Sequence, residues 1–256
     1  GPPMPEQLAR WINESEMTIA FTGAGISTES GIPDFRSPGG IWDKVQPVDF
    51  SDFVASEDAR IEYWRQKSAA HSEYSEAKPN VGHQVLARWE QQGRLSGVIT
   101  QNIDGLHQVA GSHEVLEIHG TAREVSCLDC GWRDDVSGWV AEFHETGVPP
   151  RCSECSGPLK HATISFGQNL DADVLRQCAT WAGSCDLFLA MGSSLVVHPA
   201  AGLPETAKQY GARLVIINRD ETPCDGIADL VIRGPLGESL QAADDCLAAL
   251  GEDGDG

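Results

Sequence analysis

Short apolar runs alternate with stretches of helical apolar spacing along most of the chain, and this alternation constrains the fold most. The runs are apolar throughout, which is typical of strands buried on both faces of a parallel sheet. Strands that alternate with helices predict an α/β fold in which helices cover both faces of that sheet. The expected strands are 17–22, 95–100, 186–191, 213–218 and 230–232, and the expected helices are 5–14, 80–92, 171–181, 199–209 and 237–249.

A polar or glycine-rich turn follows each of four expected strands. These turns are Gly23-Ala24-Gly25, Gln101-Asn102-Ile103-Asp104, Gly192-Ser193-Ser194 and Asn218-Arg219-Asp220. Parallel sheets bind ligands at the carboxyl ends of their strands, so the four turns are expected to meet at one ligand site.

The first turn is similar to a dinucleotide-binding loop, in which glycines let a pyrophosphate approach backbone N–H groups. The third glycine of G-x-G-x-x-G is missing, because Thr28 stands in its place. A lone G-x-G is weak evidence, and an ordinary strand-to-helix turn explains it as well. The hydroxyls of Ser193 and Ser194 and the amide of Asn218 favour a nucleotide, since such groups bond a ribose or an adenine.

Asn102, Asp104 and His119 are candidate reactive groups. Asn102 and Asp104 are two residues apart and point the same way if the strand persists. The alternative is that Asp104 caps a short helix through His107. His119 follows the apolar piece 115–118, and histidine is the side chain type whose usual pKa lies near neutrality, as a general base requires. A lone histidine is nevertheless more often structural. The other seven histidines are assigned to that structural class.

Two C-x-x-C pairs, Cys127/Cys130 and Cys152/Cys155, are separated by 21 residues. This is the ligand spacing of a tetrahedral four-thiolate zinc ribbon. Four thiolates leave no open position on the metal, so the zinc is expected to be structural. Disulfides are the alternative, but the cysteine pattern indicates a reducing compartment and hence a cytoplasmic protein. The isolated cysteines are expected to be small buried apolar residues: Cys178, Cys185, Cys224 and Cys246.

The formal net charge is −20, from 38 acidic and 18 basic residues. Such a surface repels nucleic acid and attracts basic peptides, although solubility or adaptation to salt explains it too. No apolar run approaches the length of a membrane span. We therefore expect no direct nucleic-acid binding and no membrane partner.

Taken together, the motifs resemble those of one family, the sirtuins, which are NAD-dependent protein-lysine deacylases. The resemblance covers about 10–245 and suggests a bacterial-type member with short flanks. The matching residues, in chain order, are Gly23-Ala24-Gly25-Ile26-Ser27, Gly31-Ile32-Pro33-Asp34-Phe35-Arg36, Thr100-Gln101-Asn102-Ile103-Asp104, His119-Gly120, the two C-x-x-C pairs, Phe166-Gly167, Gly192-Ser193-Ser194-Leu195 and Asn218. Jointly these motifs are far more specific than any one of them.

The resemblance implies a Rossmann-like NAD-binding domain made of 4–36, 79–119 and 166–250. A small domain would combine a helical insert, 37–78, with a zinc ribbon, 120–165. NAD and an acylated peptide would meet in the cleft between the two domains. NAD would be a consumed substrate rather than a hydride carrier, and one structural Zn²⁺ would be bound per chain.

The resemblance also assigns roles to residues. Asn102 and Asp104 would hold the nicotinamide carboxamide and orient the ribose. The acyl oxygen would then displace nicotinamide, and His119 would act as general base on a ribose hydroxyl. Phe35 would shield the intermediate from water, and Arg36 and Ser27 would steady the phosphate and ribose. The implied NAD-binding residues are Gly23, Ala24, Gly25, Ser27, Asp34, Phe35, Arg36, Gln101, Asn102, Ile103, Asp104, Gly192, Ser193, Ser194, Asn218, Arg219 and Leu236.

For the substrate, the resemblance implies an acetyl-lysine protein or peptide, with basic flanks suggested by the acidic surface. The acyl-lysine would enter a tunnel near His119, and its backbone would add as a strand between two segments. The substrate-binding residues would be Ile164, Phe166, Gly167, Gln168, Val196 and Val197.

Two positions depart from the family pattern. Gln168 replaces the usual acidic residue after Phe-Gly, and His161 replaces the usual proline, which leaves peptide preference open. Desuccinylating members carry a Tyr-x-x-Arg pair where this chain has Trp64-x-x-Lys67. Lysine cannot fork onto a carboxylate as arginine does, so an uncharged acyl group is expected.

Several alternatives stay open at the level of the sequence. An ADP-ribosyltransferase or NAD glycohydrolase on the same scaffold is the main one. A non-enzymatic NAD or acyl-lysine binding module conflicts with the presence of Asn102, Asp104 and His119. A hydride-transferring dehydrogenase is the least favoured. A monomer is expected.

Overall fold

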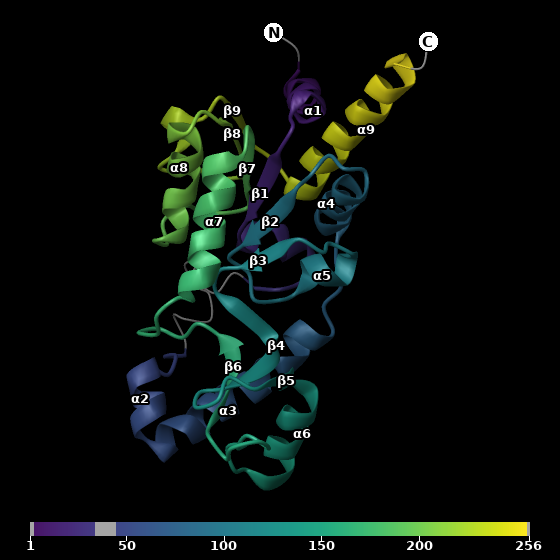
Figure 1. The fold of residues 1–256 in the computed structure, drawn as a ribbon. Coiled ribbons are helices and arrows are strands. Elements are labelled where there is room, and N and C mark those ends of the chain that lie inside the picture. Colours follow the sequence, from purple (N-terminus) through teal and green to yellow (C-terminus); the bar gives the residue numbers. More distant parts are fainter. Residues whose placement is uncertain (1–2, 34–44, 255–256) are drawn as a thin grey trace.

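A six-stranded, wholly parallel sheet forms the centre of the larger part of the molecule (Figure 1). The computed structural model describes residues 3–33 and 45–254, with side chains through 251. The strands lie in the order β3-β2-β1-β7-β8-β9, so the chain starts at the middle and winds outward in both directions. Their bounds are β1 Thr18–Thr22, β2 Gly97–Thr100, β3 Val115–Glu117, β7 Leu187–Met191, β8 Arg213–Ile217 and β9 Leu230–Ile232.

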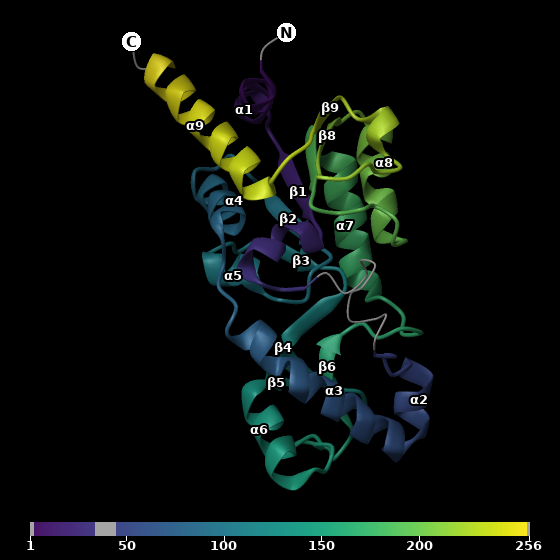
Figure 2. The ribbon, with the colours of Figure 1, turned by 180° about the vertical axis from the view of Figure 1, so that it is seen from behind.

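Helices cover both faces of this sheet, as the sequence predicted. On one face lie α1 (Met4–Glu14), α4 (Val81–Gln91) and α9 (Leu236–Gly254), and on the other lie α7 (Ala172–Ser184) and α8 (Leu203–Gln209) (Figures 1 and 2). Successive strand residues enter opposite cores because side chains of a strand alternate. Ala20 thus packs with the first group of helices, whereas its neighbours Ile19 and Phe21 pack with the second.

The expected helix and strand positions agree with the structure apart from their ends. Asn80 and Asp171 cap α4 and α7 through their side chains. The expected helix 199–209 was wrong at its start, because residues Ala200–Gly202 form a 3-10 turn and α8 begins only at Leu203. Pro204 occupies the first turn of α8, where its missing N–H is not needed. The last helix was predicted too short and runs to Gly254.

A second, smaller unit lies below the carboxyl ends of β1 and β2 in Figure 1. Its antiparallel sheet has the order β5-β4-β6, and its core holds Phe53, Trp64, Val125 and Leu159. The indole N–H of Trp64 donates to the Leu159 carbonyl at 3.1 Å. The elements are α2 (Phe50–Ala55), α3 (Glu57–Ser75), β4 (Gly120–Cys127), β5 (Arg133–Asp135), α6 (Ser137–Thr146) and β6 (Leu159–Thr163).

Two segments that are distant in the sequence therefore share one hydrophobic core, which fits the expected pairing of a helical insert with a ribbon. The exact domain boundaries stay predictions. The remaining elements are α5 (Leu106–Ala110) and the 3-10 turns η1 (Ala24–Ile26), η2 (Thr28–Ser30) and η5 (Asp225–Ile227). Within the described ranges, no helix combines the length and apolarity needed to cross a membrane.

Candidate active site

The two glycine turns at the strand ends pack directly against each other. Gly23 and Gly25 donate backbone bonds to Met191 and Gly192 carbonyls at 3.1 and 2.8 Å. A Cβ added at Gly25 would lie 2.7 Å from the Gly192 Cα atom, and Gly192 itself has φ +65°. Side chains are excluded from both positions, so the glycines let loops after β1 and β7 meet at the sheet edge.

This packing occupies most of the amides that the sequence assigned to a pyrophosphate. The amides of Ile26 and Ser27 donate to the Gly23 and Ala24 carbonyls within the turn, in addition to the two bonds described above. The structure therefore gives these glycines a packing role, and η1 follows directly as a tight 3-10 turn.

Ser27 brings Asn102 and Asp104 together. The Ser27 hydroxyl donates to the Asp104 carboxylate at 2.6 Å, and the side-chain amide of Asn102 donates to the Ser27 hydroxyl oxygen at 3.4 Å. Asn102 also donates to the Gly23 carbonyl at 3.0 Å. The other carboxylate oxygen of Asp104 accepts from the Leu106 amide at 2.9 Å. The alternative that Asp104 is the N-cap was wrong, because Gly105 is the N-cap of α5, although the Asp104 carboxylate does accept from the first helical amide. Asp104 and Asn102 both contact Ser27 at the strand ends.

His83 supports this group from α4, although the sequence gave it only a structural role. Its Nδ1 atom accepts the Asn80 amide at 3.1 Å as part of a capping box. Nδ1 therefore carries no proton, and in the neutral ring Nε2 donates, here toward the Ser27 hydroxyl at 3.3 Å. Burial lowers the pKa of His83 to about 4, against the opposing effect of the Asp104 charge. His83 is the third helical residue after the cap Asn80, and this spacing was the sequence signal for its role.

His107 lies next to His83, with 5.1 Å between the ring centroids. Its Nε2 atom lies 2.8 Å from the Thr22 hydroxyl, which donates to Thr100 at 2.8 Å. The Thr100 hydroxyl in turn accepts a hydrogen bond from the backbone amide of Asn102 at 3.1 Å. Burial, and then the neighbouring His83, lower the pKa of His107 to about 3, so this ring is neutral. A buried polar network thus connects β1, β2 and α5 to Asn102.

His119 lies just beyond β3, on the same edge of the sheet. Its Nδ1 atom is 3.0 Å from the Gln101 carbonyl, which can only accept. Nδ1 therefore carries the proton, and in the neutral ring Nε2 is the basic atom. The Gln101 side-chain oxygen accepts from the Ser193 hydroxyl at 2.6 Å, so the turns after β2 and β7 are joined here.

The other predicted NAD-binding residues lie around this edge with different exposures. Ile103 is half-buried, and its carbonyl accepts from Ala122 at 2.8 Å, while Ser194 is exposed. Asn218 donates to the Asp220 carbonyl at 2.9 Å, and Arg219 is exposed beside that residue. The half-buried Ala24 lies in η1, and the buried Leu236 begins α9. Asp34, Phe35 and Arg36 lie outside the described residues.

The predicted peptide-binding residues lie in two segments, 164–168 and 196–197, that are partly exposed. Phe166 is 45% exposed and Val196 is 60% exposed. Ile164 is half-buried, and its amide donates to the His119 carbonyl at 2.9 Å, which connects this stretch to the general-base candidate. Val197 is half-buried and Gly167 has φ +82°.

The four predicted zinc ligands converge at the end of the small unit. The sulfur atoms of Cys127, Cys130, Cys152 and Cys155 all lie within 4.8 Å of one another. Tetrahedral thiolates 2.3 Å from a metal stand about 3.8 Å apart, so the cluster fits one structural zinc ion. Backbone amides at Cys130, Glu154 and Gly157 approach ligand sulfurs at 3.4 Å, as expected for knuckles that stabilise thiolates.

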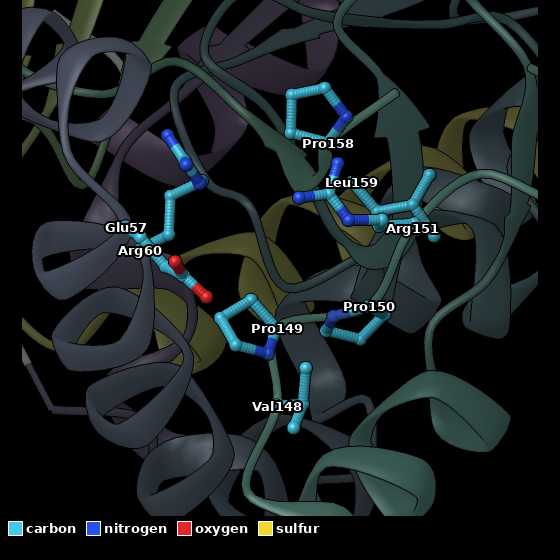
Figure 3. A pocket seen from close by; sticks show the side chains of 8 residues that line it. All are labelled: Glu57, Arg60, Val148, Pro149, Pro150, Arg151, Pro158 and Leu159. Carbon is cyan, nitrogen blue, oxygen red and sulfur yellow. The ribbon is translucent and has the colours of Figure 1, made fainter. Parts of the chain in front are cut away.

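A separate hollow lies between the start of α3 and the zinc ribbon (Figure 3). Its lining residues are Glu57, Arg60, Val148, Pro149, Pro150, Arg151, Pro158 and Leu159. None of the predicted site residues lines it. The candidate active site is therefore the edge of the parallel sheet and not this hollow.

Comparisons with known proteins agree with this geometry. A family model described as "Sir2 family" matches residues 23–199 of this chain. The chain belongs to the Sir2 family. It is 52% identical over 238 residues to an NAD-dependent protein deacetylase of Rhodopseudomonas palustris, covering 92% of this chain and 94% of that protein. It is 49% identical over 237 residues to NAD-dependent protein deacetylase 1 of Bradyrhizobium diazoefficiens, covering 92% and 93%.

Solved Sir2 structures superpose over nearly the whole of this Sir2 protein. A Sir2 complex with a p53 peptide and NAD⁺ has a TM-score of 0.84 at 36% identity, covering 100% of both chains. A Sir2 variant with a deacetylated p53 peptide and 3′-O-acetyl ADP ribose has a TM-score of 0.84 at 37% identity, covering 95% and 98%. The Rossmann-like fold predicted from the sequence is thereby confirmed.

Proposed function

We propose that this Sir2 protein is an NAD-dependent protein-lysine deacetylase that releases free lysine, nicotinamide and O-acetyl-ADP-ribose. The observation that carries the proposal is the convergence of Asn102, Asp104 and His119 on one sheet edge, through Ser27 and Gln101. The named activity of the relatives, and the products in the solved Sir2 complex, support the same reaction.

In the first step, Asn102 and Asp104 hold the nicotinamide carboxamide and orient the ribose of NAD. Asp104 suits this role because Ser27 and the Leu106 amide fix both of its oxygens. The acetyl-lysine carbonyl oxygen then bonds to the anomeric carbon, and the bond from that carbon to nicotinamide breaks. Fixed polar groups lower the cost of this step because they need no reorganisation.

In the second step, His119 takes a proton from a ribose hydroxyl, whose oxygen attacks the bound acyl carbon. The Nε2 atom is the base, because Nδ1 is committed to the Gln101 carbonyl. Water then completes the release of lysine. This assignment gives the Gln101 carbonyl a positioning role, since it fixes both the tautomer and the direction of the ring.

The NAD-binding set predicted from the sequence remains part of the proposal, including Asp34, Phe35 and Arg36. The peptide is proposed to add as a strand between 166–168 and 196–197, where exposed apolar side chains favour a partner. An uncharged acyl group is favoured, because Lys67 stands where desuccinylating members carry arginine and a lysine cannot fork onto a carboxylate. The domain boundaries given above, a monomer, basic peptide flanks and a cytoplasmic location complete the proposal.

Nicotinamide release tests this function directly. We would measure it by mass spectrometry, with and without an acetyl-lysine peptide, for the wild type, His119→Ala and the exposed control His144→Ala on α6. Peptide-dependent release with matching O-acetyl-ADP-ribose, lost only in His119→Ala, is expected. Release without peptide and without acetyl transfer would instead establish the NAD glycohydrolase or ADP-ribosyltransferase alternative.

A further inference from the structure

The turn after the exposed Phe166 lacks the acidic side chain that the family resemblance implies at this position. Gln168 stands at that position, and its side-chain oxygen accepts from the Ser165 amide at 3.0 Å. Gln168 is therefore folded back onto its own turn. A negative charge at this edge of the proposed peptide site must come from another segment.

Asp49 supplies a carboxylate at this place from the small unit. A Cβ added at Gly167 would lie 3.0 Å from Oδ2 and 3.1 Å from Oδ1 of Asp49, so the carboxylate faces the Gly167 backbone. The next residue, Phe50, donates its amide to the Phe166 carbonyl at 2.8 Å, which fixes the two segments against each other. Only glycine at 167 leaves this face of the carboxylate open.

The Asp49 carboxylate has one committed oxygen and one uncommitted oxygen. Oδ1 accepts from the Ser51 hydroxyl at 2.7 Å and from the Ser51 amide at 2.9 Å, which caps α2. These two bonds lower the pKa of the Asp49 carboxyl, so the group is ionised at neutral pH. In the part of the chain that the structure describes, no hydrogen bond is made by Oδ2, and no lysine or arginine pairs with Asp49.

We propose that Asp49 is a specificity-determining residue that binds a basic side chain of the substrate peptide next to the acyl-lysine. This inference rests on the proposed deacetylase function and places its preference for basic peptides at one carboxylate. The ion pair would be partly exposed to water, so the expected preference is modest. Exposed pairs of this kind correspond to about a two- to five-fold effect on kcat/KM.

The test compares peptides with one arginine, or its neutral replacement glutamine, at each of the two positions on either side of the acetyl-lysine. The variant is Asp49→Asn, which keeps a capping oxygen for Ser51 and removes the charge. The control is Asp52→Asn, which makes the same charge change on an exposed residue of the same helix. Activity is followed by nicotinamide release, and peptide affinity by fluorescence anisotropy without NAD.

We expect the wild type and Asp52→Asn to prefer arginine about two- to five-fold at one or two positions, and Asp49→Asn to lose this preference. Turnover of the all-glutamine peptide should be equal in the wild type and Asp52→Asn, which tests the deacetylase function separately. A preference that survives in Asp49→Asn, that disappears equally in Asp52→Asn, or that is absent from the wild type would overturn the inference. Failure of the neutral peptide to react would overturn the proposed function, and the inference with it.

Discussion

Ser27→Ala removes the hydroxyl that joins the candidate catalytic residues. The side chain is 1% exposed, and its oxygen lies 2.6 Å from Asp104, 3.3 Å from His83 and 3.4 Å from Asn102. Alanine fills nearly the same space, so the change deletes polar contacts without creating a large cavity. The buried Asp104 carboxylate then loses its short side-chain donor.

The size of the effect follows from that contact. A hydrogen bond to a charged group contributes about 1.5–3 kcal/mol to stability, and losing one at a buried carboxylate costs a similar free energy. We therefore expect about 2 kcal/mol lower free energy of unfolding, or a Tm lower by about 4–8 °C for a chain of this size. Nicotinamide release should fall at least about tenfold, since misplaced catalytic groups cost more than their contact energy.

Thermal unfolding and peptide-dependent nicotinamide release would be measured on the same preparations. The control is Thr28→Ala, which removes a neighbouring exposed hydroxyl that donates to the Gly25 carbonyl at 3.1 Å. If Ser27→Ala keeps wild-type turnover, or if Thr28→Ala loses as much, Ser27 does not organise the site.

Three further predictions concern packing, pH and metal. Gly25→Ala should cost about 1–3 kcal/mol in urea unfolding because its Cβ meets the Gly192 backbone, whereas Gly138→Ala, with open space, should be neutral or stabilising. The pKa of His107 is lowered on folding, so its contribution to stability is complete above pH 6.5 and declines toward pH 3. Relative to His107→Gln, the wild type should lose about 2 kcal/mol between pH 6.5 and 5; parallel stability curves would contradict this. Chelation should release one zinc per chain and unfold the ribbon, detected by circular dichroism, and unchanged spectra would contradict a structural metal.

The sequence by itself predicted five of the six strands of the main sheet and the four cysteines that the structure brings together. Apolar runs and caps are local signals, so the strands, Asn80 and Asp171 were placed correctly from spacing alone. The turns that meet could then be predicted, because the carboxyl ends of parallel strands lie at one edge of a sheet and every strand of the main sheet is parallel. The family was identified from the order in which several motifs occur along the chain, because no single motif was specific enough.

Only the tertiary structure decided which groups contact one another. Ser27 and Asp104 are 77 residues apart, and the positions of their side chains depend on how β1 packs beside β2. The same holds for His83, which looks like an ordinary helical histidine until α4 is placed against η1. Asp49 and Gly167 lie on different units, and their approach depends on the docking of α2 against the turn after β6. Such long-range contacts depend on packing between elements, whereas spacing along the chain records only the faces that each element presents.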